Sequence, residues 1–299
     1  MQDKTLSATG DRVTIHVSVG VAEVTLNRPD KLNALDPAMF EAIIAAGERL
    51  SRMAGLRAVV LTGAGKGFCA GLDRETFASI AAGGAVPTLR DLAKRTHGLA
   101  NDFQQAAYVW RTLPVPVIAA IHGVALGGGF QIALGADMRY VAPDARLSIL
   151  EIKWGLVPDM SGVALMRDLA RSDVIRELSL TGRVFSGAEA LSYGFATSLH
   201  ADPLAAARAT AKEIAGRSPD AVRAVKRLLN MASDADTAAI LLAESKEQTA
   251  LIGSPNQLEA VRAGVEGRPG RFADGGEDGR PLRALSHRQS SSTKSPGRL

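Results

Sequence analysis

The sequence predicts an α/β fold with a helical C-terminal region, and three observations indicate it. In the front half of the chain, short apolar runs with strand spacing alternate with segments of helical spacing. Two glycine-rich turns each follow a buried strand. In the rear half, nearly every segment has helical spacing. We therefore divide the chain into a core over residues 1–200, a helical region over residues 201–273 and a tail over residues 274–299, which we expect to be disordered.

The N-terminal part of the core begins with a hairpin pattern. Residues 13–19 and 21–26 alternate apolar and polar side chains around Gly20. An Asp-Pro pair at positions 36 and 37 then predicts a helix start, because Asp caps a helix and Pro fits its first position. Residues 57–62 form an apolar run that predicts a short buried strand.

The middle of the chain continues the alternation. Residues 91–113 predict one long helix, and residues 117–121 predict a buried strand. Residues 137–142 and 146–151 predict two further extended segments. The helices expected after them cover residues 162–171, 172–180, 186–192, 202–215, 218–231, 235–251 and 255–266.

Composition excludes several classes of function. The net charge of +4 comes wholly from residue 267 onward, where seven basic residues face three acidic ones, so the body is neutral and lacks the basic face of a nucleic-acid-binding protein. We expect no membrane span, because the most apolar segment, residues 113–136, contains prolines, polar residues and three glycines. We find no metal-ligand spacing. The absence of an apolar signal segment and the single cysteine, Cys69, predict a cytoplasmic protein.

The first glycine-rich turn holds three consecutive glycines, at positions 127–129, between a predicted strand and a predicted helix. A helix start exposes unpaired N–H groups with partial positive charge, and glycines leave them open to a ligand oxygen that becomes negative during a reaction. The alternative is that the glycines only let two backbone segments pack closely.

The second glycine-rich turn covers residues 63–73 and follows the strand at residues 57–62. It does not match a phosphate-binding loop, because Lys66 is followed by glycine instead of Ser or Thr. Its glycine spacing also fails the dinucleotide-binding pattern. The turn therefore predicts neither nucleotide hydrolysis nor dinucleotide binding.

Four blocks in the same order resemble the crotonase family, also called the enoyl-CoA hydratase/isomerase family. They are Asn27-Arg28-Pro29 with residues 32–35, and then residues 67–73, 125–129 and 151–158. The resemblance covers about residues 13–272. It implies a core spiral of ββα units with an acyl-CoA site, and a helical C-terminal region that forms a homotrimer or homohexamer. It also implies a coenzyme A thioester as substrate and no other cofactor.

The resemblance further implies that two backbone N–H groups bind the thioester oxygen and stabilise an enolate. By position these belong to Leu72 and Gly128. It implies two catalytic glutamates in hydratases, of which only Glu151 is present, because Gln131 takes the place of the other. An amide cannot act as an acid or base near neutral pH. By position, Asp159 also has the spacing to Glu151 that the dienoyl-CoA isomerase branch has; the alternative is that it only caps the following helix.

We expect Glu151 and Asp159 to be the catalytic residues, and double-bond isomerisation to be slightly favoured over hydration because one carboxylate can move a proton between two carbons. Alternatives are thioester hydrolysis, decarboxylation, carbon–carbon cleavage or acyl-CoA binding without catalysis. Candidate pocket residues are Ala70, Asp73, Phe130, Gln131, Trp154 and Met160. Candidate contacts to the coenzyme A phosphates are Arg28 and Lys31.

Overall fold

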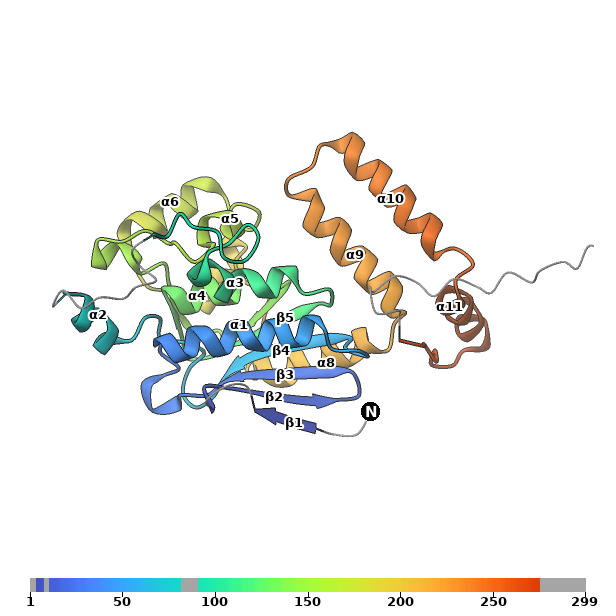
Figure 1. Cartoon of the computed structure of the whole chain (residues 1–299), viewed down its shortest axis with the longest axis horizontal. Helices are drawn as coiled ribbons and strands as arrows, with labels where there is room; N and C mark the ends of the chain where they lie inside the picture. The colour runs from blue at the N-terminus through green and yellow to red at the C-terminus, as the bar shows by residue number, and fades with distance from the viewer. Residues whose placement is uncertain (1–3, 8–10, 82–90, 275–299) are drawn as a thin grey trace, which may run out of the picture.

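A seven-stranded sheet forms the centre of the molecule in the computed structural model, which describes residues 4–7, 11–81 and 91–274 (Figure 1). The strand order is β1-β2-β3-β4-β5-β7-β10. The first three strands pair antiparallel and the others pair parallel. The strands are β1 (Lys4–Ser7), β2 (Val13–Ser18), β3 (Val21–Leu26), β4 (Ala58–Gly63), β5 (Val117–Ile121), β7 (Met138–Val141) and β10 (Ser198–Leu199). The predicted α/β architecture is thereby confirmed, including the hairpin around Gly20.

A second, three-stranded sheet positions the first glycine turn. It consists of β6 (Val124–Leu126), β8 (Arg146–Ser148) and β9 (Phe185–Ser186) in the order β6-β8-β9. Strand β6 pairs parallel with β8 and leads directly into α4 (Gly128–Leu134). Strand β8 leads towards the short helix η4 (Glu151–Trp154). The glycine turn and Glu151 therefore follow neighbouring strands.

Helices cover both faces of the large sheet. On one face α1 (Pro37–Ser51) and α3 (Asp102–Thr112) pack in the main apolar core (Figure 1). On the other face α8 (Pro203–Ala215) buries Ala207 and Ala211 against β4 and β5. Helix α1 begins as predicted, because the Asp36 side chain accepts a hydrogen bond from the Met39 N–H and Pro37 occupies the first turn.

The predicted long helix over residues 91–113 is wrong at its N-terminal end. Helix α3 begins only at Asp102, where Asn101 and Gln104 form a capping box. The segment before it turns at Gly98, whose φ of +65° is left-handed. Asn and Gln at this spacing specify a helix start, so local capping prevailed over the apolar spacing that suggested a continuous helix.

The remaining helices connect and extend the core. They are η2 (Pro29–Lys31), α2 (Arg74–Ala81), α5 (Gly162–Met166), α6 (Ser172–Thr181), α7 (Gly187–Tyr193), α9 (Pro219–Ala232), α10 (Thr237–Leu251) and α11 (Pro255–Glu266). Helices α9 and α10 form a hairpin that stands away from the sheet (Figure 1). No helix in the described part of the chain is long and apolar enough to cross a membrane. Residues 275–299 of the predicted tail lie outside the described residues.

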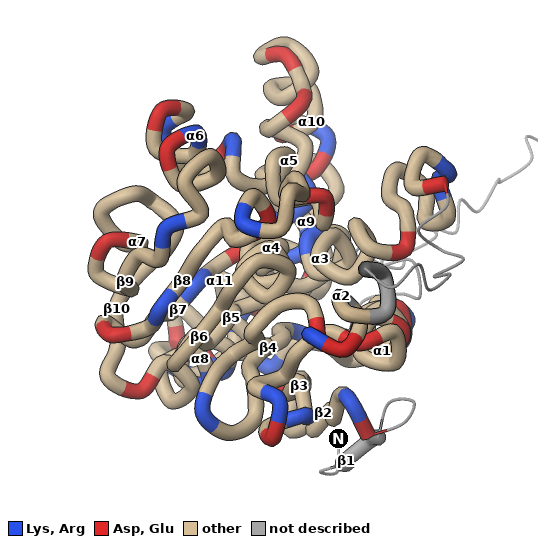
Figure 2. The backbone as a smooth tube through the Cα atoms, turned by 90° about the vertical axis from the view of Figure 1, so that its left-hand side faces the viewer, with Lys and Arg blue, Asp and Glu red and all other residues tan. Residues whose placement is uncertain are grey.

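Charges of both signs are interspersed along the described backbone (Figure 2). Many of them form ion pairs between elements, such as Arg208 with Glu23 at 2.6 Å and Arg227 with Glu247 at 2.7 Å. This distribution agrees with the neutral body on which the prediction of no nucleic-acid partner depends.

Candidate active site

The first glycine turn adopts a conformation that requires its glycines. Gly127 has φ +52° and ψ −121°, a combination that side chains disfavour. Its N–H donates to the Ser148 carbonyl oxygen at 2.9 Å, which ties the turn to β8. A Cβ on Gly129 would lie 2.3 Å from the Cys69 carbonyl oxygen. Close packing therefore explains Gly129. It does not exclude a role for the N–H groups at the start of α4, so both interpretations of the glycine turn remain.

The second glycine turn runs beside the first. The Cys69 N–H donates to the Val124 oxygen at 2.9 Å, and the Leu126 N–H donates to the Cys69 oxygen at 3.0 Å. On its other edge the turn pairs with Leu35, which donates to the Gly71 oxygen and accepts from the Asp73 N–H.

This pairing sets the direction of the Leu72 amide. Leu35 bonds to the residues on either side of Leu72, so the N–H of Leu72 itself points away from Leu35, to the side where β6 and the first glycine turn lie. A Cβ built on Gly71 would be 3.6 Å from the Gly128 nitrogen. The Gly128 N–H is in the first turn of α4, where amides have no partner within the helix. The structure thus brings the Leu72 and Gly128 segments together.

Arg28 and Asp73 form a buried ion pair that holds the second turn. The Arg28 Nη1 donates to Asp73 Oδ2 at 2.5 Å and to the Ala34 oxygen at 3.1 Å, and both side chains are buried. The ion pair and the hydrogen bond that Asp73 accepts from the Glu75 N–H outweigh burial and lower the pKa of Asp73. The structure therefore gives both residues a role in holding the turn, and their assignment to phosphate binding and to the pocket stays a prediction.

Asn33 is a second support for this turn that the sequence reasoning missed. It is fully buried, and its Nδ2 donates to the carbonyl oxygens of Ala64, Gly67 and Phe68 at 2.9, 2.9 and 3.2 Å. Its Oδ1 accepts from the Arg28 N–H at 2.8 Å. The left-handed backbone of Asn33, with φ +56°, is favoured by Asn over most residues.

Glu151 lies beside the first glycine turn and is held by Gln131. The Gln131 Nε2 donates to Glu151 Oε1 at 2.6 Å, and both side chains are buried. A Cβ on Gly127 would be 3.2 Å from the same Oε1. The other oxygen, Oε2, is buried and has no hydrogen-bond partner among the described residues. One oxygen of the carboxylate is therefore held by a hydrogen bond, and the other is buried without a partner among the described residues.

Gln131, and not Asp159, caps the start of α5. Its Oε1 accepts from the Met160 N–H at 2.9 Å and from the Gly162 N–H at 3.0 Å, at the start of α5. The N-cap residue of α5 is Ser161, whose side chain makes no capping bond. The cap of α5 therefore comes from α4. Nothing in the local sequence indicates this contact, since the two partners are about 30 positions apart.

The two carboxylates influence each other. Burial raises the pKa of Glu151, the hydrogen bond from Gln131 opposes this, and the charge of Asp159 adds to the rise. The pKa of Asp159 is also raised, mainly because the surrounding protein partly removes its carboxylate from water, although the residue remains exposed. The contribution of Asp159 to the pKa of Glu151 indicates that the two carboxylates lie near each other, Glu151 buried and Asp159 exposed.

The four remaining predicted pocket residues lie in different surroundings. Met160 is buried with its sulfur against Gly128, where a Cβ would be 2.7 Å from it, and Trp154 is exposed on η4. Ala70 lies in the second turn and donates its N–H to the Leu32 oxygen. Phe130 packs edge-on against Phe185 and Phe195 in the core, at 5.6 and 5.4 Å between ring centres, and its place in the pocket stays a prediction.

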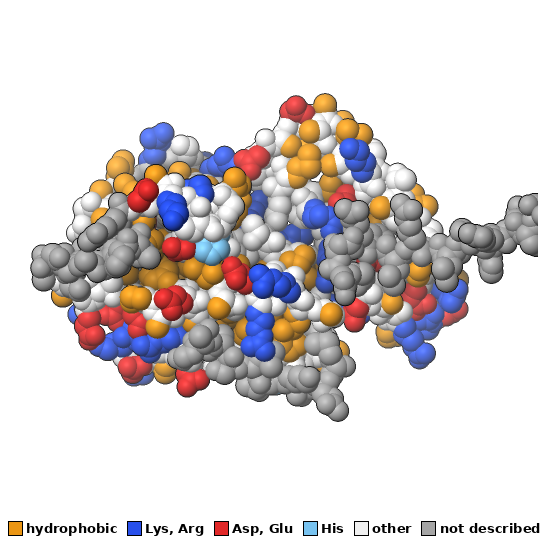
Figure 3. Space-filling model, viewed as in Figure 1, with side chains coloured by type: hydrophobic (Ala, Val, Ile, Leu, Met, Phe, Trp, Pro, Cys, Tyr) orange, Lys and Arg blue, Asp and Glu red, His pale blue; other side chains and the backbone are white. Residues whose placement is uncertain are grey.

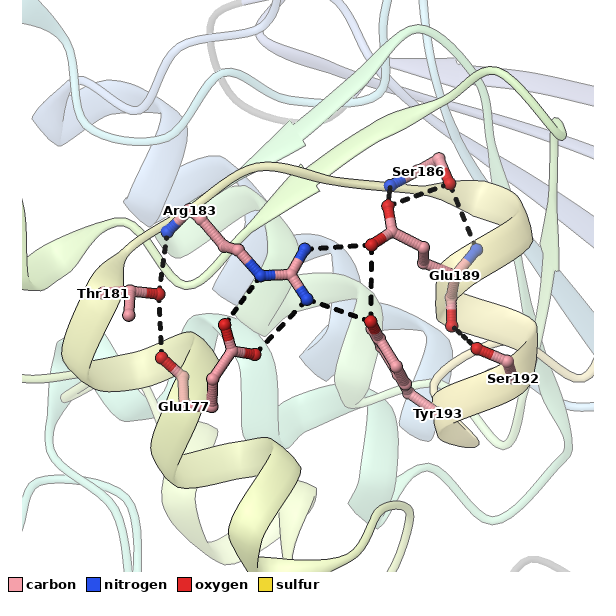
Figure 4. Close-up of polar contacts among 7 residues, drawn as sticks. All are labelled: Glu177, Thr181, Arg183, Ser186, Glu189, Ser192 and Tyr193. Atoms are coloured by element: carbon pink, nitrogen blue, oxygen red, sulfur yellow. Dashed lines mark hydrogen bonds and ion pairs between the residues drawn. The ribbon is translucent and has the colours of Figure 1, made fainter.

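The segment that carries Glu151 is hydrogen-bonded to the connection between α6 and α7. The buried Ser148 hydroxyl donates to the Gly182 oxygen at 3.1 Å. Next to Gly182, Arg183 lies between Glu177 of α6 and Glu189 and Tyr193 of α7, bonding to all three (Figure 4). This network ties the ends of both helices to the loop that supports η4.

Comparison with known proteins supplies the family context. A family model described as enoyl-CoA hydratase/isomerase matches residues 16–275. The human mitochondrial Delta(3,5)-Delta(2,4)-dienoyl-CoA isomerase is 31% identical over 252 residues, covering 83% of this chain and 77% of the relative. The (E)-benzylidenesuccinyl-CoA hydratase of Thauera aromatica is 33% identical, covering 74% and 83%.

Solved structures agree with this result. The enoyl-CoA hydratase of Bacillus anthracis superposes with a TM-score of 0.79 at 28% identity, covering 87% of this chain and 98% of the other. The enoyl-CoA hydratase of Mycobacterium tuberculosis superposes with a TM-score of 0.76 at 29% identity, covering 88% and 99%. The spiral core with C-terminal helices that the sequence predicted is therefore the fold of this chain.

Proposed function

Because the chain belongs to the enoyl-CoA hydratase/isomerase family, we propose that it moves a carbon–carbon double bond in an enoyl-CoA thioester. The proposal depends on one observation. The Gln131 amide fixes one oxygen of Glu151, and the other oxygen is buried without a partner. A single carboxylate held in this way can take a proton from one carbon and return it to another.

The reaction needs no net gain or loss of protons. The amides of Leu72 and Gly128 bind the thioester oxygen, while Glu151 Oε2 removes a proton from the carbon next to the carbonyl. The electron pair of the broken C–H bond moves onto that oxygen and gives a dienolate, which the two N–H groups stabilise. The same proton then returns two carbons further along, and the double bond becomes conjugated with the thioester.

Hydration is the second candidate. It is favoured by the presence of a second carboxylate, Asp159, near Glu151. Hydration requires an activated water and a proton for carbon. The Gln131 oxygen already accepts two backbone bonds, so Gln131 is poorly placed to activate the water. Asp159, which is exposed and has a raised pKa, is the other acid able to contribute.

A substrate panel with the wild-type protein tests the proposal. We expect turnover of 3-enoyl-CoA or 3,5-dienoyl-CoA to exceed hydration of 2-enoyl-CoA, measured by absorbance of the conjugated thioester. Dominant hydration would favour the second candidate. Release of free coenzyme A would indicate thioester hydrolysis, and loss of carbon dioxide or carbon–carbon cleavage would also refute isomerisation. Tight binding without turnover would indicate a non-catalytic acyl-CoA-binding protein.

The pH dependence of isomerisation should report the environment of Glu151. Glu151 must be ionised to act as a base, so kcat/KM should fall as the pH drops through its raised pKa, with a midpoint above the ordinary 4.5. D159N removes a charge that raises this pKa and should move the midpoint down. Q131M removes a hydrogen bond that lowers it and should move the midpoint up. Equal midpoints in all three proteins would contradict the assignment.

We also propose that the chain assembles into a homotrimer or homohexamer through its C-terminal helices. Helix α10 packs on α9 and buries none of its own residues, and Leu241 and Leu242 on it are 57% and 56% exposed. Hydrophobic side chains gather on the surface of this hairpin (Figure 3). Such a face favours burial against another copy.

Charged substitutions on α10 test the assembly. The double variant L241E/L242E should reduce the molar mass measured by light scattering from that of a trimer or hexamer to that of one chain. E244Q, on the same helix, is the control and should leave the mass unchanged. A wild-type protein of monomer mass at micromolar concentration would contradict the proposal.

Three further expectations accompany this function. Lys31, which pairs with Glu75 on the surface at 3.0 Å, is a candidate with Arg28 for contact with the coenzyme A phosphates. We propose that coenzyme A enters only as part of the substrate and that no other cofactor is needed.

A cytoplasmic location stays a prediction, since the human relative is mitochondrial.

A further inference from the structure

A cavity of about 200 Å³ lies apart from Glu151, at the C-terminal ends of α3 and α9. Helix α5 and the segment between α4 and β7 close its other sides. Six charged side chains line it, and they are Arg111, Arg139, Arg167, Asp137, Asp168 and Asp234. None of these residues belongs to the proposed active site.

The carboxylates of the cavity are already paired. Arg167 binds Asp234 and lies 3.7 Å from Asp168. Asp137 Oδ2 accepts from Lys226 Nζ and from the Val117 N–H, each at 2.7 Å. These pairs leave two of the lining cations, Arg111 and Arg139, to be accounted for.

Arg111 and Arg139 form no ion pair within the part of the chain that the structure describes. Arg111 Nη2 donates to the Ser233 hydroxyl at 3.0 Å. Arg139 is buried, and its Nε and Nη1 donate only to the carbonyl oxygens of Phe195 and Ala136, at 2.7 and 2.6 Å. Carbonyl oxygens satisfy N–H donors but carry no full charge to balance the guanidinium.

Positive charges lie close together here. The pKa of Arg139 is lowered to about 10, mainly by burial, with Asp137 opposing the change and the charge of Arg111 adding to it. Burial also lowers the pKa of Lys226, again with a contribution from Arg111. In the described structure Arg139 therefore has only Asp137 as a nearby opposite charge, and Asp137 is already paired with Lys226. The cavity beside them is large enough for several water molecules.

We propose that this cavity is a binding site for a small oxyanion of phosphate size, held between Arg111 and Arg139. The guanidinium group suits this ligand, because its planar N–H donors match pairs of oxyanion oxygens. An anion here would supply the missing negative charge. The site is independent of the proposed isomerase activity.

Phosphate binding by the full-length protein tests the proposal. The melting temperature should rise by about 2–4 °C when phosphate at roughly ten times its Kd replaces chloride at constant ionic strength. The variant R111Q should lose this rise, and calorimetric titration should show the loss of binding. R208Q is the matched control, because Arg208 pairs with Glu23 on the surface away from the cavity, and it should respond like the wild type.

A second pair of variants keeps the test decisive if R111Q folds poorly. Ala164 lines the cavity and is exposed on α5, so larger side chains fit there without burial in the core. A164E places a competing carboxylate at the cavity and should abolish the phosphate response, whereas A164Q, of equal size, should retain part of it. No rise above chloride in the wild type, or an equal rise in R111Q and A164E, would overturn the proposal.

Discussion

Replacing Glu151 with glutamine should lower kcat for isomerisation by about 10³–10⁴-fold, near the upper range for loss of a general acid–base group. The change keeps the shape of the side chain, and its amide oxygen can still accept the hydrogen bond from Gln131 Nε2. It removes only the ability to take up and return a proton. The measurement is a steady-state assay of the preferred substrate from the panel.

The binding of the thioester separates this role from a structural one. The Kd of a non-reactive acyl-CoA, measured by calorimetry, should stay within about threefold in E151Q. The base acts on the transition state and contributes little to binding of the ground state. E151D is the companion variant, since it retains the carboxylate but withdraws it by one methylene. Activity of E151D equal to that of E151Q would agree with strict positioning, whereas full activity of E151Q would refute Glu151 as the base.

The second large effect should come from the Gly128 amide. Proline at this position removes the N–H and is tolerated at the first position of a helix. G128P should therefore lower kcat by about 10²–10³-fold, the typical loss for one donor of an oxyanion hole. The assay is the same as for E151Q, with far-UV circular dichroism to verify the fold.

G128A is the matched control for this variant. Its Cβ would lie 2.7 Å from the Met160 sulfur and 2.9 Å from Leu35 Cδ1, both at the ends of flexible side chains that can move. It keeps the N–H, so its kcat should stay within about tenfold of the wild type. If G128A and G128P lost equal activity, crowding of the pocket would explain both, and the donor role of Gly128 would be refuted.

Local patterns predicted most of the fold correctly. The hairpin at Gly20 and the helix start at Asp36 depend on residues adjacent in sequence, and both are present. The helix expected over residues 91–113 failed at the one place where a capping box overrides apolar spacing. The packing of Phe130 against Phe185 was not predictable from the sequence, since an aromatic residue beside a glycine turn fits a core as well as a pocket.

The arrangement around Glu151 was less accessible to sequence reasoning. The sequence identified Gln131 as a departure from two acids, but not that its amide bonds to Glu151 and to the start of α5. The support of the second turn by Asn33 and Arg28 was missed in the same way. These contacts join segments brought together only by the fold, and no short-range pattern specifies them.

The double use of the Gln131 side chain also determines what a second acid at this position would do. A glutamate at position 131 would accept the Met160 and Gly162 N–H groups on one oxygen and place the other beside Glu151. Two carboxyl groups this close cannot both ionise easily, so the pKa of one of them would rise strongly and the pair would hold a proton. The amide of Gln131 donates to Glu151 without adding a titratable group, so Glu151 titrates here with no second carboxyl at position 131.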